Sequence, residues 1–390
     1  MTHSDRYLAL PGPHQPLTGN RVTLRGPAEL ADALPYLLGY HPDDSIVVVA
    51  VHGENGRFGG RVRLGIPSVA EEWPGTARDV AACLLGDGGA LRDRPRGVVL
   101  YLCQDPHGTE EPQDAMERLR PLARELRTAF GVREVPVYDA LCVSAGRFWS
   151  YCCPDPACCP PAGTALGPPG TSAMAAAAAY AGITVQGTLK ELTARLAPLG
   201  PPLAARQERA LDAASTALVP LMCPAPDGGR AEEVRARTLL RAARLLDRFR
   251  AAPPEQGGGN GRTDAHDDGL VTEEEAADLI VGLQDRRTRD RAAEWMEGDD
   301  AEPALRMWRA LSRRCPGAYA EHAAAPLTLA GWVAWSSGDE VGARVALGQA
   351  LAADPECFFA QLLHSACNSG LDPEALRTCL REQRAAHTAG

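Results

Sequence analysis

S-I-V-V-V-A-V, residues Ser45–Val51, is a continuous apolar run in which β-branched side chains dominate. It lacks the apolar–polar alternation of a half-exposed strand, and a strand buried on both faces is the structure that tolerates such a run. Gly97–Cys103, G-V-V-L-Y-L-C, has the same pattern. We therefore expect Ile46–Val51 and Val98–Leu102 to be central, adjacent strands of one sheet.

The segments around these two strands alternate between helix and strand patterns. Pro27 and Pro112 each open an amphipathic helix, and Gly39 suits the end of the first one. The expected elements are a strand at Arg21–Arg25, helices at 27–38, 76–85 and 112–130, and hairpin strands at 61–66, 135–143 and 147–151. This order predicts a mixed-sheet α/β domain over residues 21–170.

Composition divides the rest of the chain. Residues 1–20 are rich in Pro, Gly and polar side chains, which predicts a disordered tail. Residues 171–250 have helical patterns, and residues 251–269, rich in Gly, Pro and Asp, resemble a flexible linker. Residues 270–386 form a helical, repeat-like region. The predicted fold is thus an α/β domain followed by an all-α, tetratricopeptide-like region.

A weak internal repeat supports the last assignment. The residues Ala292, Trp295, Ala304, Trp308, Leu311 and Pro316 recur 39 positions later as Gly331, Ala334, Ala343, Leu347, Ala350 and Pro355. Small residues recur where two helices would touch, and proline ends the second helix each time. The offsets are those of a tetratricopeptide repeat, whose usual length is about 34 residues. We expect antiparallel helix pairs over Asp290–Pro355 that bind protein rather than small molecules.

The bulk composition excludes several classes of protein. A hydrophobic content of 45% and a charged content of 23% are typical of a globular chain. The formal net charge of −10 argues against nucleic-acid binding and against binding to an anionic membrane. The N-terminus lacks the pattern of a signal peptide, and the Ala-rich run Ala173–Ala181 is too short to span a bilayer. We therefore expect a cytoplasmic protein with mostly reduced thiols.

A cysteine-rich segment follows the last predicted hairpin. Cys152, Cys153, Cys158 and Cys159 lie within eight residues of sequence, among prolines. Cys153, Cys158 and Cys159 are candidate zinc ligands, although adjacent cysteines rarely both reach one ion. Neighbouring thiols could instead form a reversible disulfide, or remain reduced and half-buried in a proline-braced loop. The sequence leaves these three alternatives open, and we expect the thiols to lie close together in space.

A second candidate is the polar segment H-P-D-D-S just before the first buried strand. His41, Asp43, Asp44 and Ser45 offer an imidazole, two carboxylates and a hydroxyl, which could hold a metal or serve in acid–base chemistry. The alternative is a structural role, because a helix stop at Gly39 followed by an Asx turn would use the same residues.

Two weaker candidates lie elsewhere. Asp105 and His107 follow the second buried strand, and ligands of open α/β sheets bind outside the carboxyl ends of strands. A stripe of arginines on one later helix comprises Arg237, Arg241, Arg244 and Arg248. It could bind an acidic partner, although such a stripe is more often the solvated face of an amphipathic helix.

Several motifs together match those of a known family. They are L-R-G at 24–26, P-Y-L-L-G-Y-H-P-D-D-S at 35–45, W-S-Y at 149–151, Cys153, C-C-P-P at 158–161, G-T at 163–164, R-D at 289–290 and the helical pair Trp332–Pro355. On these residues the chain resembles the actinobacterial domain-of-unknown-function family 4192, over roughly Arg21 to Gly370. The resemblance implies no established activity.

The sequence therefore assigns no reaction. It contains none of the motifs G-x-x-x-x-G-K, G-x-G-x-x-G and H-E-x-x-H. We expect a protein-interaction or adaptor module whose C-terminal helices bind another protein. The alternative is an enzyme, or a small-ligand, redox or metal sensor with zinc as its candidate cofactor, whose site lies near the cysteine-rich segment. A deep pocket with convergent His, Asp and Cys side chains would favour this alternative, and a shallow helical groove would favour the adaptor.

Overall fold

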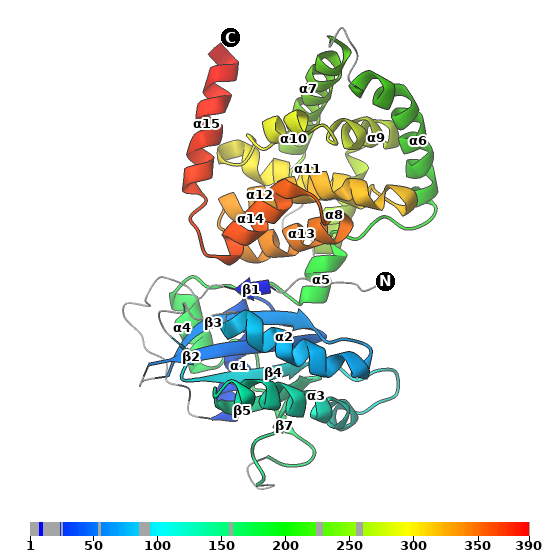
Figure 1. The fold of residues 1–390 in the computed structure, drawn as a ribbon. Coiled ribbons are helices and arrows are strands. Elements are labelled where there is room, and N and C mark those ends of the chain that lie inside the picture. The colour runs from blue at the N-terminus through cyan, green and yellow to red at the C-terminus, as the bar shows by residue number, and fades with distance from the viewer. Residues whose placement is uncertain are drawn as a thin grey trace. The chain divides into compact units, whose positions relative to one another are not determined.

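The computed structural model describes residues 8–10, 24, 26–53, 56–85, 94–155, 159–223, 229–254 and 260–389. The chain forms two compact units, which Figure 1 shows with their elements labelled. The first, here called the α/β unit, comprises residues 1–189 and 368–370, and the second, the helical unit, comprises residues 190–367 and 371–390. The predicted order of a mixed α/β part followed by helices is confirmed.

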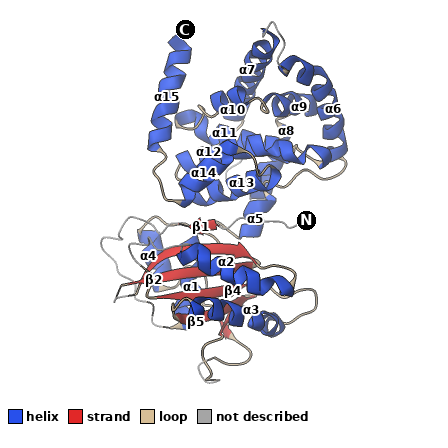
Figure 2. Cartoon of the chain, viewed as in Figure 1, coloured by secondary structure: helices blue, strands red, loops and turns tan. Residues whose placement is uncertain are grey.

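A seven-stranded sheet forms the centre of the α/β unit (Figure 2). Its strands are β1 (Leu8–Leu10), β2 (Ser45–His52), β3 (Arg57–Gly65), β4 (Gly97–Cys103), β5 (Val137–Ser144), β6 (Arg147–Ser150) and β7 (Thr164–Ala165). Their spatial order is β1-β3-β2-β4-β5-β6-β7. β4 and β5 pair in parallel, and the other neighbours in this sheet pair antiparallel.

The two apolar runs are neighbours at the centre of the sheet, as the sequence predicts. β2 and β4 pair antiparallel with Val48 opposite Leu100. Every residue of β4 is buried, and in β2 only His52 is partly exposed. Because both faces of these strands are covered, neither strand needs a polar side, and the sequence shows no alternation.

Helices cover both faces of the sheet. They are α1 (Pro27–Leu38), α2 (Trp73–Leu85, preceded by a short 3₁₀ turn, Ala70–Glu72), α3 (Pro112–Val132) and α4 (Ala173–Tyr180). α2 and α3 lie across one face, where they share a core with Val48 and Leu100 (Figure 1). On the opposite face the Tyr101 hydroxyl donates a hydrogen bond to the Leu30 carbonyl of α1 at 3.1 Å. The α/β unit therefore has helix, sheet and helix layers.

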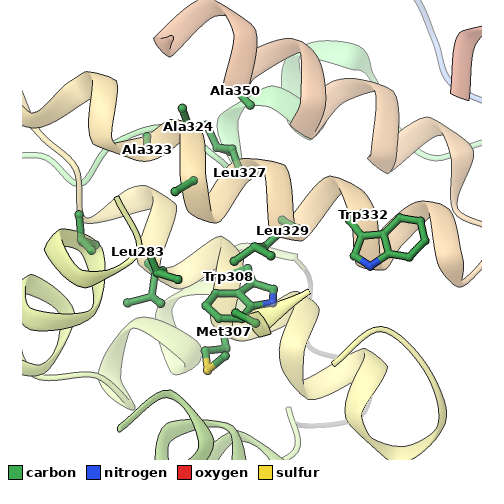
Figure 3. Close-up of a cluster of buried hydrophobic side chains, with 14 of the residues drawn as sticks. Leu283, Met307, Trp308, Ala323, Ala324, Leu327, Leu329, Trp332 and Ala350 are labelled. Carbon is green, nitrogen blue, oxygen red and sulfur yellow. The ribbon is translucent and has the colours of Figure 1, made fainter. Parts of the chain in front are cut away.

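The helical unit continues from Lys190. Its elements are α5 (Leu189–Ala194), α6 (Leu203–Met222), α7 (Gly229–Ala251), α8 (Asn260–Gly269), α9 (Glu273–Gly282), α10 (Arg286–Ala292), α11 (Ala301–Arg313), α12 (Ala324–Ser336), α13 (Glu340–Ala353), α14 (Phe358–Asn368) and α15 (Glu374–Ala389), with 3₁₀ turns at Gly298–Asp300 and Gly317–Ala323. Trp308 and Trp332 are fully buried in its core. In Figure 3 Trp308 lies near Met307 and Leu329, and Trp332 lies apart from them, further along α12. No helix of the described residues is long and apolar enough to cross a membrane.

Two segments differ from the expectations of composition. Residues 8–10, within the predicted tail, pair with β3 as strand β1. Residues 260–269, within the predicted linker, form α8. Asp267 of α8 is buried and accepts hydrogen bonds from Arg306 of α11 at 2.6 and 3.0 Å. A tertiary ion pair thus stabilises a helix whose Gly- and Asp-rich sequence has low helix propensity. The predicted strand at 21–25 lies almost wholly outside the described residues.

Candidate functional site

The directions of the strands bring two sequence candidates to one edge of the sheet. β3, β4 and β5 run the same way, while β2 runs oppositely between β3 and β4. The carboxyl ends of β3, β4 and β5 therefore lie beside the start of β2, which carries the H-P-D-D-S segment. We call this region the polar edge and define it as His41, Asp43, Asp44, Ser45, Gln104, Glu110 and Arg118. Open α/β sheets bind ligands at edges of this kind.

A chain of hydrogen bonds joins the polar edge. Gln104 Nε2 donates to Asp44 Oδ1 at 3.0 Å, and Arg118 Nη1 of α3 donates to Gln104 Oε1. Arg118 Nη2 in turn pairs with Glu110 Oε2 at 3.0 Å. These bonds tie the H-P-D-D-S turn to the end of β4 and to α3. Sequence reasoning identified Asp44 but missed its three companions, because the signal is a tertiary contact and no local spacing indicates it.

Residues of β3 and of the segment just after it hold the turn before β2 in place. Ser45 is fully buried; its hydroxyl donates to the Asp43 carbonyl and accepts from Arg63 Nε at 2.9 Å. Asp44 has a left-handed φ of 41°, a conformation that Asp tolerates better than most residues. Its carbonyl accepts from the Ile66 N–H at 2.8 Å. The short polar side chains thus shape the turn itself.

His41 has a separate environment. Its N–H donates to the Gly187 carbonyl at 2.9 Å, and its carbonyl accepts from the Leu189 N–H at 3.0 Å. Its side chain is exposed. Within the described ranges, no three His, Cys, Asp or Glu side chains gather closely enough to hold a metal ion. The structure therefore brings Asp44 to Gln104 without forming a preorganised metal site there.

Asp105 and His107 have different partners. Asp105 Oδ1 accepts from the Ala145 N–H at 2.6 Å, which ties the β5–β6 turn to the end of β4. Ala145 has a φ of 45°, so this bond supports a strained turn. The His107 N–H donates to Glu110 Oε2 at 3.0 Å. Both residues thus organise the loops after β4.

The cysteine-rich segment is described only in part. Cys158 lies outside the described residues, so zinc binding by Cys153, Cys158 and Cys159 stays a prediction. Cys153 and Cys159 are both half-buried. The backbone N–H groups of Cys152 and Cys153 both donate to Ser150 Oγ at 3.1 Å. The start of the segment is therefore fixed to the end of β6.

The electrostatics of the neighbouring thiols disfavour the reactive thiolate. Burial raises the pKa of Cys152, although Arg127 acts in the opposite direction. Burial also raises the pKa of Cys142 to about 11 and holds the pKa of Cys103 well above its ordinary value. Because the thiolate is the nucleophile and the metal ligand, these thiols behave as small apolar side chains at neutral pH.

Half of the arginine stripe on α7 is used within the helical unit. Arg241 pairs with Asp278 of α9, and Arg248 binds Glu275 of α9 at 2.7 and 2.9 Å. Arg237 and Arg244 are exposed, as is Leu240 between them. Two of the four arginines therefore fix α7 to α9.

A different surface stands out in the helical unit. From Cys357 to Leu371 the sequence has no Asp, Glu, Lys or Arg. Phe358 and Leu362, four residues apart on α14, are 62% and 51% exposed, and Leu371 after the helix is 58% exposed. We call these three residues the α14 face. The opposite side of α14, which includes Leu363, is buried. The long uncharged run is the sequence signal that could have identified this face.

Both regions fall within one family match. The model of a family described as "Domain of unknown function (DUF4192)" matches residues 27–374. The chain belongs to this family. The DUF4192 match spans the polar edge and the α14 face. No curated protein matches the chain, and neither does any solved structure. The function must therefore be argued from the geometry of this DUF4192 protein itself.

Proposed function

We propose that this protein is a non-enzymatic binding protein whose helical unit docks another protein through the α14 face. The observation that carries the proposal is the exposure of Phe358 and Leu362 on adjacent turns of an uncharged helix. Burying a large apolar side chain contributes about 1.5–3 kcal/mol. Two such side chains side by side supply the apolar anchors that a protein partner needs.

An amphipathic helix of the partner is the occupant that fits. Phe358 and Leu362 are spaced i, i+4, which is the spacing at which helices present apolar anchors to one another. α14 offers no charge that would recognise a charged partner, so the partner's contact residues must be apolar too.

The last helix of the chain has its own attachment and leaves the α14 face open. Arg381 of α15 binds Glu297 at 2.7 Å, and Arg384 of α15 binds Asp300 at 2.9 Å. Phe358 and Leu362 keep their high exposure although α15 is present. A helix from another chain could therefore cover them without displacing α15.

Stacked, tetratricopeptide-like packing is part of the same proposal. A Cβ added to Gly331 of α12 would lie 2.6 Å from Leu347 Cγ of α13, which supports the predicted contact within one helix pair. Trp295 stacks on Trp308 with ring centroids 6.1 Å apart, at positions 39 residues before Ala334 and Leu347. Stacked helix pairs expose extended surfaces that bind peptides and helices.

The polar edge supports a binding protein more than an enzyme. Asp44, Gln104, Arg118 and Glu110 use their hydrogen-bonding groups on one another. The buried thiols have raised pKa values, and burial, the first cause in each case, favours the neutral form. The hydrogen bonds among the polar side chains therefore position the loops of the α/β unit, and the neutral thiols act as small apolar side chains.

Site-specific photocrosslinking tests the proposal. A benzophenone amino acid replaces Phe358 in the full chain, and the matched control replaces Leu240, which is 53% exposed on α7. After irradiation in an extract of the source cells, we expect one protein to be captured from position 358 and not from position 240. Equal capture at both positions, capture of a second copy of the chain, or a crosslink to the chain's own residues 26–189 would contradict it.

A further inference from the structure

An open groove lies between α3 and the segment that leads into β5, and it encloses about 350 Å³. It is lined by Arg124, Arg127, Thr128, Gly131, Val135, Pro136 and Val137. The first four residues recur at helical spacing, so they line the groove from one side of α3. The last three form the opposite wall. Its size lies at the lower end of the range for small-molecule sites, about 300–1,000 Å³.

The groove contains two arginines without an acidic partner. Within the described part of the chain, neither Arg124 nor Arg127 forms an ion pair with an Asp or Glu side chain. Glu117, whose pKa Arg124 also lowers, is held by Arg120 through hydrogen bonds of 2.7 and 2.8 Å. Two arginine residues therefore line one concavity in a chain whose formal net charge is −10.

The end of α3 would by itself oppose an anion, because the last carbonyls of a helix carry partial negative charge. Here those carbonyls have cationic partners. Arg133 Nη1 donates to the Ala129 carbonyl at 3.4 Å, and Arg94 Nη2 donates to the Arg133 carbonyl. These two further arginines offset the partial negative charge at the end of α3. Arg124 and Arg127 therefore stay available for a ligand.

We propose that this groove binds the oxyanion group, phosphate or carboxylate, of a small molecule. The planar guanidinium fork matches both oxyanions through paired N–H donors. The Thr128 hydroxyl adds a neutral donor, and Pro136 and Val137, which are exposed and partly exposed, add apolar surface for the rest of the ligand. The inference concerns the α/β unit and does not depend on protein binding by the α14 face.

Calorimetric titration of the full chain with inorganic phosphate, and separately with citrate, tests this site at constant ionic strength. The groove variant is Arg124→Gln/Arg127→Gln. The matched control is Arg57→Gln/Arg78→Gln, which removes the same charge from exposed positions on β3 and α2. We expect saturable one-site binding of at least one anion, at least tenfold weaker in the groove variant and unchanged in the control. The tighter anion identifies the ligand's acidic group.

Three results would overturn the proposal: no saturable binding of either anion, an equal loss in both double variants, or unchanged binding in the groove variant. Both arginines are exposed, so the variants should fold. Thr128→Val is a second test that leaves the charge unchanged, and we expect it to weaken binding of the same anion severalfold. Thermal melts of each variant separate loss of binding from loss of structure.

Discussion

Gln104 Nε2 and Asp44 Oδ1 lie 3.0 Å apart, although 60 positions separate the two residues in the sequence. Gln104 is 8% exposed and also accepts a hydrogen bond from Arg118. A single amide side chain thus connects the turn before β2 with α3. Its nearly complete burial makes this connection important for the stability of the α/β unit.

Gln104→Leu should destabilise the α/β unit, because an apolar side chain of similar size removes the hydrogen bonds that Gln104 makes with Asp44 and Arg118. We expect a loss of about 1–3 kcal/mol in the free energy of unfolding, measured with urea. Asp44→Asn keeps an acceptor oxygen and is the control, with a smaller loss. Equal stability of Gln104→Leu and the parent would show that the connection has no structural role.

Arg306 and Arg309 are neighbours on α11 and should respond in opposite ways to replacement by methionine. Arg306 is 5% exposed and binds the buried Asp267, so Arg306→Met leaves a buried carboxylate unpaired and should cost about 3–5 kcal/mol. Arg309 has Asp339 at 3.9 Å, and burial lowers its pKa to about 10. Arg309→Met should therefore be neutral or stabilising. Urea unfolding measures the stability of both variants. If Arg309→Met proved less stable than Arg306→Met, this interpretation of the two sites would be wrong.

The contact between α12 and α13 predicts a contrast between two glycines. Gly331→Leu should cost about 1–3 kcal/mol, because its new side chain would overlap Leu347. Gly348 of α13 has nothing within 4 Å of an added Cβ, so Gly348→Ala should be neutral or stabilise by up to about 1 kcal/mol. Thermal unfolding compares them. If Gly331→Leu has the same melting temperature as the parent, α12 and α13 do not meet at this residue.

The attachment of α15 should depend on pH. Hydrogen bonding from Arg381, the largest cause, holds the pKa of Glu297 below its ordinary value of 4.5. A carboxyl whose pKa is lower in the folded state adds stability above its unfolded pKa, and this is lost as pH falls through the folded pKa. The difference in unfolding free energy between the parent and Glu297→Gln should therefore be largest near pH 7 and shrink below about pH 4. A difference that stays constant down to pH 3 would contradict the assignment.

The helices and strands that are determined by their own local sequence could be predicted from it. β2 and β4 follow from unbroken apolar runs, and α1 follows from Pro27 at its first position and Gly39, with a left-handed φ of 84°, at its end. α8 could not be predicted in this way, because Asp264 and Asp267 make its sequence resemble a loop until their arginine partners are known.

The candidate sites show the same division. Asp44 belongs to a local polar motif and was identified, whereas Gln104 and Arg118 become its partners only through strand order and helix placement. The exposure of Phe358 depends on which side of α14 the rest of the helical unit covers. A pattern within one segment does not contain that information.

The most direct test of protein binding by the helical unit is the affinity of the purified chain for the protein captured at position 358. Titration calorimetry compares the parent with Phe358→Ser/Leu362→Ser and with the control Leu240→Ser, each checked by its thermal melt. We predict that the dissociation constant rises at least tenfold for the double variant and stays unchanged for the control. An unchanged dissociation constant for the correctly folded double variant would contradict docking at the α14 face.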